Sequence, residues 1–185
     1  MKTTLSHPGL LARSLLASAV TVLALAHGAS PGAEIPKLRG QTLDGKPIVL
    51  PDDAAGKVTL LVLGASRKGG DRTGRWKDHF LTDFGTNPLA TYYVAALLQR
   101  VPAAFRGVIR TGMRSGTPDA ARSHVVTSAS DEDAWKNYLG MRDDTLPGIV
   151  LLDQSGHVLW RHVGLFDAHQ YEALKAAATT ELGHL

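Results

Sequence analysis

The stretch KVTLLVLG, residues 57–64, is a continuous run of β-branched and leucine side chains between its terminal lysine and glycine. A strand of this kind is typical of the centre of a sheet that is covered by helices on both faces. TYYVAALL, residues 91–98, predicts a second such strand. Between the two, Trp76, Phe80 and Phe84 recur at i, i+4 and i+8, which predicts a helix with one apolar face. This order of elements indicates an α/β domain.

Turn and capping signals divide the rest of the chain into short elements. Asp44-Gly45 accepts the positive φ of a hairpin turn, and Ser130 and Asp167 are typical helix N-caps. We therefore expect one α/β domain with a mixed central sheet that is flanked by helices and preceded by a β-hairpin. The expected elements are a hairpin over 37–50, loops over 51–56 and 66–74, a helix over 75–84, a helix over 102–112 with Phe105, Val108 and Ile109 on one side, a loop over 113–122, a strand over 124–127, a helix over 130–141, antiparallel strands over 148–152 and 157–163, and a last helix over 167–181.

The N-terminal end has the features of an export signal. LLASAVTVLALA, residues 15–26, spans about 12 residues, which is shorter than the roughly 20 that a transmembrane helix needs. Lys2 and Arg13 precede it, and it ends in small residues at alternate positions, Ala24 and Ala26. We therefore expect a periplasmic or secreted protein, with an uncleaved membrane anchor as the alternative. The predicted organisation is a signal peptide over 1–29, cleaved near Ala26–Ala29, a flexible entry over 30–36, and one domain over 37–185.

The composition excludes several classes of function. The chain has 185 residues, of which 44% are hydrophobic and 20% charged, and it contains no cysteine. Disulfides, thiolate metal sites and cysteine catalysis are therefore excluded for this sequence. The formal net charge of +3 falls to about +1 without Lys2 and Arg13, which is too little to indicate a nucleic-acid partner.

Two parts of the chain resemble periplasmic thioredoxin-like proteins. PGIVLLD, residues 147–153, followed by Gly156 and by HVLWRHVG, residues 157–164, resembles their C-terminal strands, in which a cis-proline starts the strand and an aspartate ends it. LDGK, residues 43–46, resembles the segment before the central strand of exported thiol reductases and peroxiredoxins. The resemblance covers about residues 36–182, and it implies a thioredoxin-like fold with an N-terminal β-hairpin extension.

The redox motif of that family is missing from this sequence. In the family a Cys-x-x-Cys pair follows the central strand, and aligning on Ala65-Ser66 places Lys68–Asp71 (KGGD) at that position. A lysine cannot form the mixed disulfide through which thiol exchange proceeds. The resemblance therefore implies the fold without the thiol chemistry, and we expect neither oxidoreductase nor peroxidase activity.

A second set of motifs carries a narrower resemblance. The motifs are Trp76 and Phe80 after a cysteine-free loop, Leu139-Gly140-Met141, Gly148 to Asp153, and Trp160 with Gly164. They resemble the mitochondrial ATP synthase assembly-factor family, which has a thioredoxin-like fold, lacks the redox pair and binds a hydrophobic membrane subunit. This resemblance implies a protein or peptide partner, such as a membrane-protein subunit, and a role as assembly factor or chaperone in preference to an enzyme.

The first candidate site is a peptide-binding groove. In thioredoxin-like proteins the residue before the cis-proline faces the redox loop, and an extended peptide pairs with it. A cis bond before Pro147 costs little and would expose the backbone of Leu146 for such pairing, whereas an ordinary trans proline that opens a strand is the alternative. The expected groove residues are Ser66, Arg67, Lys68, Gly69, Gly70, Asp71, Leu146 and Pro147.

The second candidate site is the basic loop from Arg67 to Arg75. Cations and glycines ahead of a helix N-terminus can bind an anion, so Lys68, Arg72 and Arg75 would hold a phosphate or carboxylate in a small-anion binder or enzyme. The alternative is a solvated loop whose glycines permit a tight turn, because the order of residues is not that of a phosphate-binding loop. Asp71 would also neutralise part of the charge.

Trp160 is the third candidate. The hairpin that carries it is expected at the edge of the sheet, where an exposed tryptophan would anchor a partner and a buried one would belong to the core.

The histidines suggest no metal site, because His157 and His162 fall on opposite faces of one strand. The sequence around Ser66 lacks the Gly-x-Ser-x-Gly motif of a nucleophile elbow. We therefore assign no catalytic residue and expect no metal and no cofactor.

Overall fold

The computed structural model describes residues 35–183 of the chain. The predicted signal peptide over 1–29, its cleavage near Ala26–Ala29 and nearly all of the entry over 30–36 lie outside these residues. Within residues 35–183, no helix has both the length and the apolar character needed to span a bilayer.

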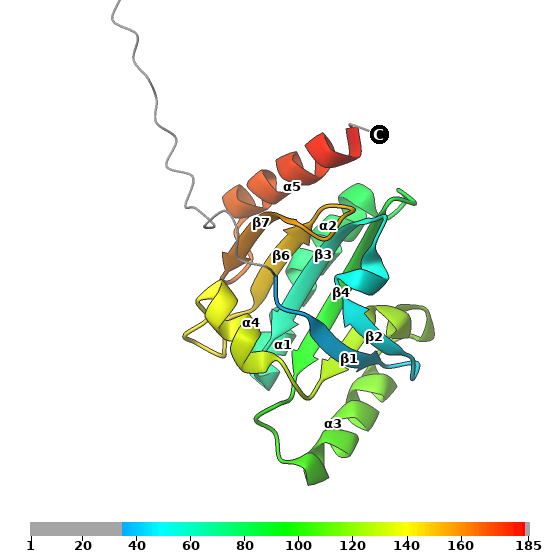
Figure 1. The fold of residues 1–185 in the computed structure, drawn as a ribbon, viewed down its shortest axis with the longest axis vertical. Coiled ribbons are helices and arrows are strands. Elements are labelled where there is room, and N and C mark those ends of the chain that lie inside the picture. The colour runs from blue at the N-terminus through cyan, green and yellow to red at the C-terminus, as the bar shows by residue number, and fades with distance from the viewer. Residues whose placement is uncertain (1–34, 184–185) are drawn as a thin grey trace, which may run out of the picture. The chain divides into compact units, whose positions relative to one another are not determined.

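The described chain forms one seven-stranded sheet with helices against it (Figure 1). The strand order is β2-β1-β5-β4-β3-β6-β7, so β2 and β7 are the two edges. The elements are β1 (Leu38–Thr42), β2 (Pro47–Leu50), the 3-10 turn η1 (Asp52–Ala54), β3 (Val58–Gly64), α1 (Arg67–Asp71), α2 (Gly74–Phe84), β4 (Ala90–Leu97), α3 (Ala103–Gly116), the 3-10 turn η2 (Asp119–His124), β5 (Val125–Ser128), α4 (Glu132–Leu139), β6 (Gly148–Leu152), β7 (Val158–Val163) and α5 (Ala168–Gly183).

The centre of the sheet confirms the prediction made from KVTLLVLG. All seven residues of β3 are buried. β3 is parallel to β4, which is parallel to β5, and β3 is antiparallel to β6. The hairpins at the two ends are also confirmed, since β1 pairs antiparallel with β2, and β6 with β7. The result is a mixed sheet with the order of elements that the thioredoxin resemblance implies.

Two hydrophobic clusters use the alternating side chains of β3, because successive residues of a strand point to opposite faces. Leu61 and Leu63 pack with Trp135 of α4 and with the N-terminal hairpin. Leu60 and Val62 pack with Trp76 of α2 and with the inner side of α5. Burial of each large side chain contributes roughly 1.5–3 kcal/mol, so the sheet is stabilised from both faces.

The segment 66–74, expected as a loop, contains the helix α1. Ser66 is its N-cap, and the Gly69 amide donates a hydrogen bond of 3.0 Å to the Ser66 hydroxyl. Adjacent glycines disfavour a helix intrinsically, which is why the pattern predicted a loop. The contacts of α1 with the rest of the fold, described below, outweigh that preference.

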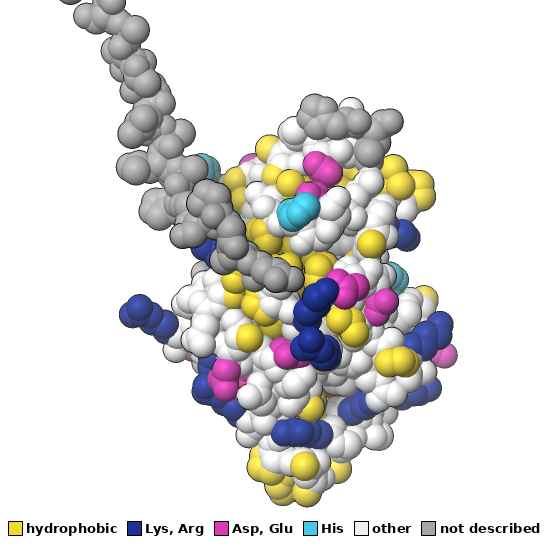
Figure 2. Space-filling model, in the orientation of Figure 1, with side chains coloured by type: hydrophobic (Ala, Val, Ile, Leu, Met, Phe, Trp, Pro, Cys, Tyr) yellow, Lys and Arg dark blue, Asp and Glu magenta, His cyan; other side chains and the backbone are white. Residues whose placement is uncertain are grey.

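The crossover between β4 and β5 also differs from expectation. α3 runs to Gly116 where the helix was expected to end at Gly112, and η2 occupies part of the expected loop over 113–122. No residue of α3 is buried within the described chain, and Phe105 and Val108 are 60% and 72% exposed. Figure 2 shows apolar side chains at this end of the molecule, with Lys and Arg around them.

Of the two predicted helix caps, one is confirmed and one is wrong. The Gln170 amide donates to the Asp167 carboxylate at 2.9 Å, which caps α5 as expected. α4 begins one residue later than a Ser130 cap requires, because Asp131 takes the N-cap position with a φ of 66°. The Ser130 hydroxyl instead donates to the Asp131 carboxylate at 2.8 Å.

Candidate functional site

Three segments meet at the carboxyl end of β3: α1, residues 142–147, and the turn over 164–166. We call them together the mouth. The Ser66 hydroxyl donates a hydrogen bond of 2.6 Å to the carbonyl of Asp144. A Cβ added to Gly69 would stand 2.6 Å from the same carbonyl oxygen, so α1 lies directly on this segment. The Asp144 carboxylate pairs with Lys136 of α4, which fixes the segment from its other side.

Further hydrogen bonds connect the mouth to β7. Arg72 donates to the carbonyl of Thr145 at 2.7 Å and to its hydroxyl at 3.2 Å. The Gly164 amide donates to the carbonyl of Pro147 at 3.1 Å, and the Trp76 indole donates to the carbonyl of Gly164 at 3.3 Å. The mouth is therefore a connected surface built from segments that are far apart in the sequence.

The predicted groove residues come together, and the Leu146 amide among them is bonded within the chain. The one cis peptide bond within the described chain joins Leu50 and Pro51, so the Leu146–Pro147 bond is trans. Pro147 is buried, and the Leu146 amide donates to the carbonyl of Asp143 at 3.1 Å. The cis-proline implied by the resemblance is therefore wrong for this chain. The Leu146 N–H that was to pair with a peptide closes a turn of its own chain instead.

Asp143 stabilises that turn. Its carboxylate accepts a hydrogen bond of 2.8 Å from the Thr145 amide. This hydrogen bond is the main reason that the pKa of Asp143 lies below its ordinary value, and the charges of Arg72 and Lys68 lower it further. Asp143 therefore stays ionised in the mouth and offsets part of its positive charge.

The cations of the predicted anion loop have separate partners. Arg72 is bonded to Thr145, as described above, whereas Arg75 lies over the ring of Phe166 with its guanidinium carbon 4.8 Å from the centroid. The amides at the start of α1 are also engaged, because Gly69 and Gly70 donate to the side chain and carbonyl of Ser66. Lys68, Arg72 and Arg75 all lie in or beside the mouth, but Arg72 and Arg75 are directed to different segments.

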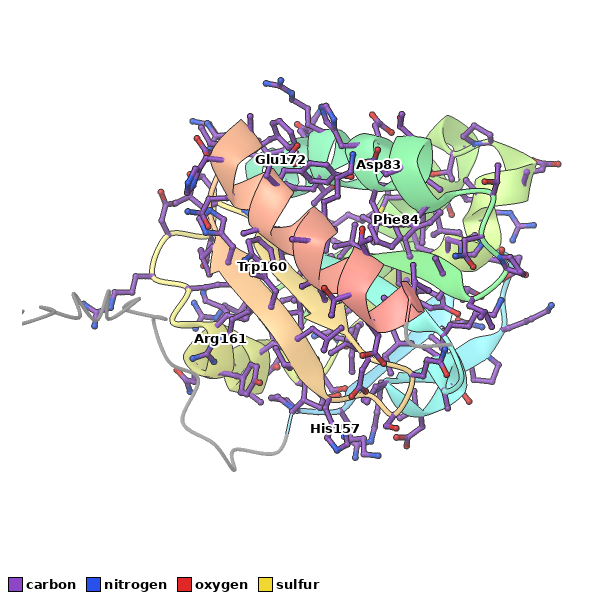
Figure 3. All side chains as sticks on the ribbon, turned by 90° about the horizontal axis from the view of Figure 1, so that it is seen from above. Asp83, Phe84, His157, Trp160, Arg161 and Glu172 are labelled. Carbon is purple, nitrogen blue, oxygen red and sulfur yellow. The ribbon has the colours of Figure 1, made fainter. Side chains whose placement is uncertain are left out.

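Trp160 lies on β7 beneath α5, at the edge of the sheet (Figure 3). Its ring is half-buried and packs 5.8 Å from Trp76 and 5.8 Å from His162, measured between centroids. Trp160 thus combines the two alternatives: it packs against the cluster under α5, and part of it remains accessible. Burial lowers the pKa of His162, so this imidazole stays neutral at neutral pH.

Leu165 is the mouth residue that sequence reasoning missed. It is 51% exposed in the turn between β7 and α5, next to Gly164, which bonds to Pro147. The signal was present as two apolar residues, Leu165 and Phe166, between the end of a strand and the Asp167 cap, where polar turn residues are usual. An exposed leucine at the end of a strand gives the mouth an apolar contact point.

Among residues 35–183, no group of three His, Asp or Glu side chains is arranged to hold a metal ion. Ser66, the one hydroxyl considered as a nucleophile, donates its proton to the Asp144 carbonyl and accepts from the Gly69 amide. It therefore acts as a helix cap that also fastens the mouth.

Comparisons with known proteins identify the fold. No protein-family model and no curated protein matches this chain. A candidate thiol:disulfide interchange protein DsbE from Chlorobium tepidum superposes with a TM-score of 0.59 at 21% identity, covering 81% of this chain and 96% of that protein. The thioredoxin domain of a thiol-disulfide oxidoreductase from Bacteroides vulgatus gives a TM-score of 0.55 at 15% identity, covering 80% and 98%. The exposed lipoprotein thioredoxin Etrx1 from Streptococcus pneumoniae gives 0.53 at 15% identity, covering 78% and 99%.

Similarity at these identities establishes the fold alone. The chain has a thioredoxin-like fold whose structural neighbours are thiol-disulfide oxidoreductase-like proteins, and it has no cysteine. The helix that follows β3 begins with Arg67-Lys68-Gly69-Gly70-Asp71.

Proposed function

We propose that this chain is a non-redox thioredoxin-fold protein of the cell envelope that binds a protein or peptide partner at the mouth. The observation that carries the proposal is the exposed Leu165, which is 51% accessible on a turn that hydrogen bonds fasten to Pro147 and Trp76. An apolar side chain held on a rigid support is the kind of residue that anchors a partner. Lys68 and Arg72 add positive charge elsewhere in the mouth, so the partner expected is an apolar segment with acidic residues nearby.

Recognition in this proposal uses side chains. The Leu146 amide, which was first expected to pair with a peptide, donates to Asp143 of its own chain instead. Leu165 supplies apolar contact area and Lys68 supplies charge at the opposite side of the mouth. Trp160 is a secondary contact, since it is half-buried on the edge strand β7. Binding of this kind needs no reacting group, in keeping with the absence of any thiol from the sequence.

The compartment and the role rest on resemblance. One structural neighbour is described as an exposed lipoprotein, and the apolar run before residue 30 is typical of an export signal. An exported, cysteine-free thioredoxin-like protein fits the role of an assembly factor or chaperone, with a membrane-protein subunit as one kind of partner. The alternative, a small-anion binder or enzyme that uses Arg67–Arg75, is less well supported, because Arg72 and Arg75 are engaged with other segments of the chain.

Site-specific photocrosslinking tests the proposal. A benzophenone amino acid is placed at Leu165, at Lys68, or at Ser155, which is exposed in the β6–β7 turn at the opposite end of those strands. In the native cell envelope, Leu165 and Lys68 should give the same crosslinked protein, and Ser155 should not. Crosslinks that are equal at all three positions, or absent at Leu165 and Lys68, would refute binding at the mouth.

A redox assay gives an independent test. The protein should not accelerate the reduction of insulin by dithiothreitol above the rate in buffer, because no thiolate is available for exchange. Clear acceleration would refute the non-redox part of the proposal and leave the crosslinking result unaffected.

A further inference from the structure

A cavity lies away from the mouth, between α3 and the strands β1 and β5. It has a volume of about 510 Å³, which is within the range of small-molecule sites. Its floor is formed where β4 and β5 end, and in open α/β sheets ligands bind outside the carboxyl ends of parallel strands. The residues that line it are Arg39, Gly40, Gln41, Leu98, Arg106, Gly107, Arg110, Thr127, Ser128, Ala129 and Ser130.

The charge of this cavity is entirely positive. Arg39, Arg106 and Arg110 line it, and no carboxylate of the described chain does. Of the next acids along the chain, Asp131 pairs with Arg39 at 3.2 Å and offsets the charge of that arginine, and Glu132 is buried against Arg100. Two of the three arginines in the cavity therefore have no acidic partner within residues 35–183.

The arginines are held in place by neutral acceptors. Arg106 donates to the carbonyls of Val101 and Gln99, each at 2.8 Å. Arg110 donates to the carbonyl of Thr42 at 2.8 Å and to the side chain of Gln41. These bonds orient both guanidinium groups without neutralising them, and they leave further N–H donors for a ligand. A guanidinium oriented in this way is suited to bidentate binding of phosphate or carboxylate.

The sequence of α3 adds a second argument. Arg106, Arg110 and Arg114 follow one another at i, i+4 and i+8, and the helix contains no acidic residue. Like charges at this spacing destabilise a helix, and α3 has no buried side chain among the described residues to offset that repulsion. An anion between α3 and the sheet would relieve the repulsion at two of the three positions.

We propose that this cavity binds a small polyvalent oxyanion, either a phosphate ester or a polycarboxylate. Arg106 and Arg110 would contact its charged oxygens from α3. The hydroxyls of Thr127 and Ser130 also line the cavity, but they donate to the Gln41 carbonyl at 3.2 Å and to the Asp131 carboxylate at 2.8 Å, so the donors for a ligand come from α3. This site is distinct from the mouth and does not depend on the proposed partner binding.

The test uses two glycines of the same helix. Gly107 lines the cavity, whereas Gly112 does not. A Cβ at either position meets no described atom within 4 Å, so both accept a side chain without a clash. Gly107→Glu and Gly112→Glu make the same change in charge and the same gain in helix propensity. Only Gly107→Glu places a carboxylate at the cavity.

Calorimetric titration of the full chain with pyrophosphate and with citrate, at constant ionic strength, measures the binding. We expect saturable one-to-one binding of at least one of the two ions. If pyrophosphate binds more tightly the ligand belongs to the phosphate class, and if citrate binds more tightly it belongs to the carboxylate class. Gly107→Glu should weaken that binding by at least about tenfold through charge repulsion at short range, and Gly112→Glu by less than about threefold. Arg106→Gln should weaken it as well, with the fold checked by circular dichroism.

Two results would overturn the proposal. One is the absence of saturable binding of either ion. The other is an equal loss of affinity in Gly107→Glu and Gly112→Glu, which would show that the ions respond to the general charge of α3 and not to this cavity.

Discussion

Gly69 and Asp144 are in direct backbone contact, although 75 residues separate them: a Cβ on Gly69 would stand 2.6 Å from the Asp144 carbonyl oxygen. The Ser66 hydroxyl donates to the same oxygen at 2.6 Å. In a thioredoxin-like fold this is the place where the first helix faces the segment before β6. Here the two segments are packed directly against each other at the Asp144 carbonyl.

The two glycines of α1 should respond oppositely to alanine. Gly69→Ala forces its Cβ against backbone, and we expect the free energy of unfolding to fall by about 1–3 kcal/mol. Gly70→Ala meets no described atom within 4 Å, and it should raise the free energy of unfolding by up to about 1 kcal/mol through better helix propensity. Urea denaturation of both variants checks the pair. Equal effects would show that α1 does not pack on Asp144 as described.

The sheet was predictable because its signals are local. The run over 57–64 is apolar on both faces, and in the structure every residue from Val58 to Gly64 is buried. The turn at Asp44-Gly45 and the cap at Asp167 depend on a few neighbouring atoms, and both are confirmed. The tertiary structure preserves both of these local patterns, whereas Asp131 takes the cap position that was predicted for Ser130.

The mouth was predictable only in outline. Its members were named correctly as neighbours, because the end of β3 and the start of β6 adjoin in this order of elements. The contacts within the mouth were not predicted. The trans bond before Pro147 and the packing of Gly69 depend on segments that are far apart in the chain. α1 shows the same limit: its glycines argue against a helix, and the contacts with Asp144 and Ser66 outweigh them.

The apolar side chains of α3 are exposed, so they should contribute less to stability than apolar side chains of the core. Phe105 and Val108, expected on one side of a helix, are 60% and 72% exposed, whereas Phe80 of α2 is 1% exposed. Val108→Ser should therefore change the free energy of unfolding by less than about 0.5 kcal/mol. Phe80→Ala should lower it by about 3–5 kcal/mol through loss of burial and creation of a cavity. A cost above 2 kcal/mol for Val108→Ser would mean that α3 is packed against other parts of the chain.

His162 should make the protein less stable in mild acid. Burial lowers its pKa in the folded state below the ordinary value of 6.5. As the pH falls below 6.5, the unfolded chain takes up a proton that the folded chain resists, so the free energy of unfolding decreases until the lower folded-state pKa is passed. His162→Gln should flatten the profile in this window. His169→Gln, on the exposed side of α5, should leave the slope unchanged. Identical slopes for the two variants would contradict the assignment.

The contact between α5 and α2 should also lose stability in acid, but at lower pH than His162. The Tyr171 hydroxyl donates to Asp83 at 2.6 Å, and Lys175 pairs with the same carboxylate at 2.9 Å. The hydrogen bond from Tyr171 is the main reason that the pKa of Asp83 lies below 3.8, and the one from Lys175 lowers it further. This stabilisation is complete above the unfolded-state pKa, and it is lost as the pH falls through the folded-state pKa.

Tyr171→Phe removes the donor and keeps the ring. At pH 7 we expect the free energy of unfolding to fall by about 1.5–3 kcal/mol, the range for a hydrogen bond to a charged group. The acid limb below pH 4 should become shallower, because the pKa of Asp83 returns toward its ordinary value. Lys175→Met provides the comparison: the lysine side chain is 40% exposed, so the loss at pH 7 should stay below about 1 kcal/mol. If Tyr171→Phe shifted the whole profile down without changing its slope in acid, the tyrosine would stabilise α5 by packing and not through the carboxylate.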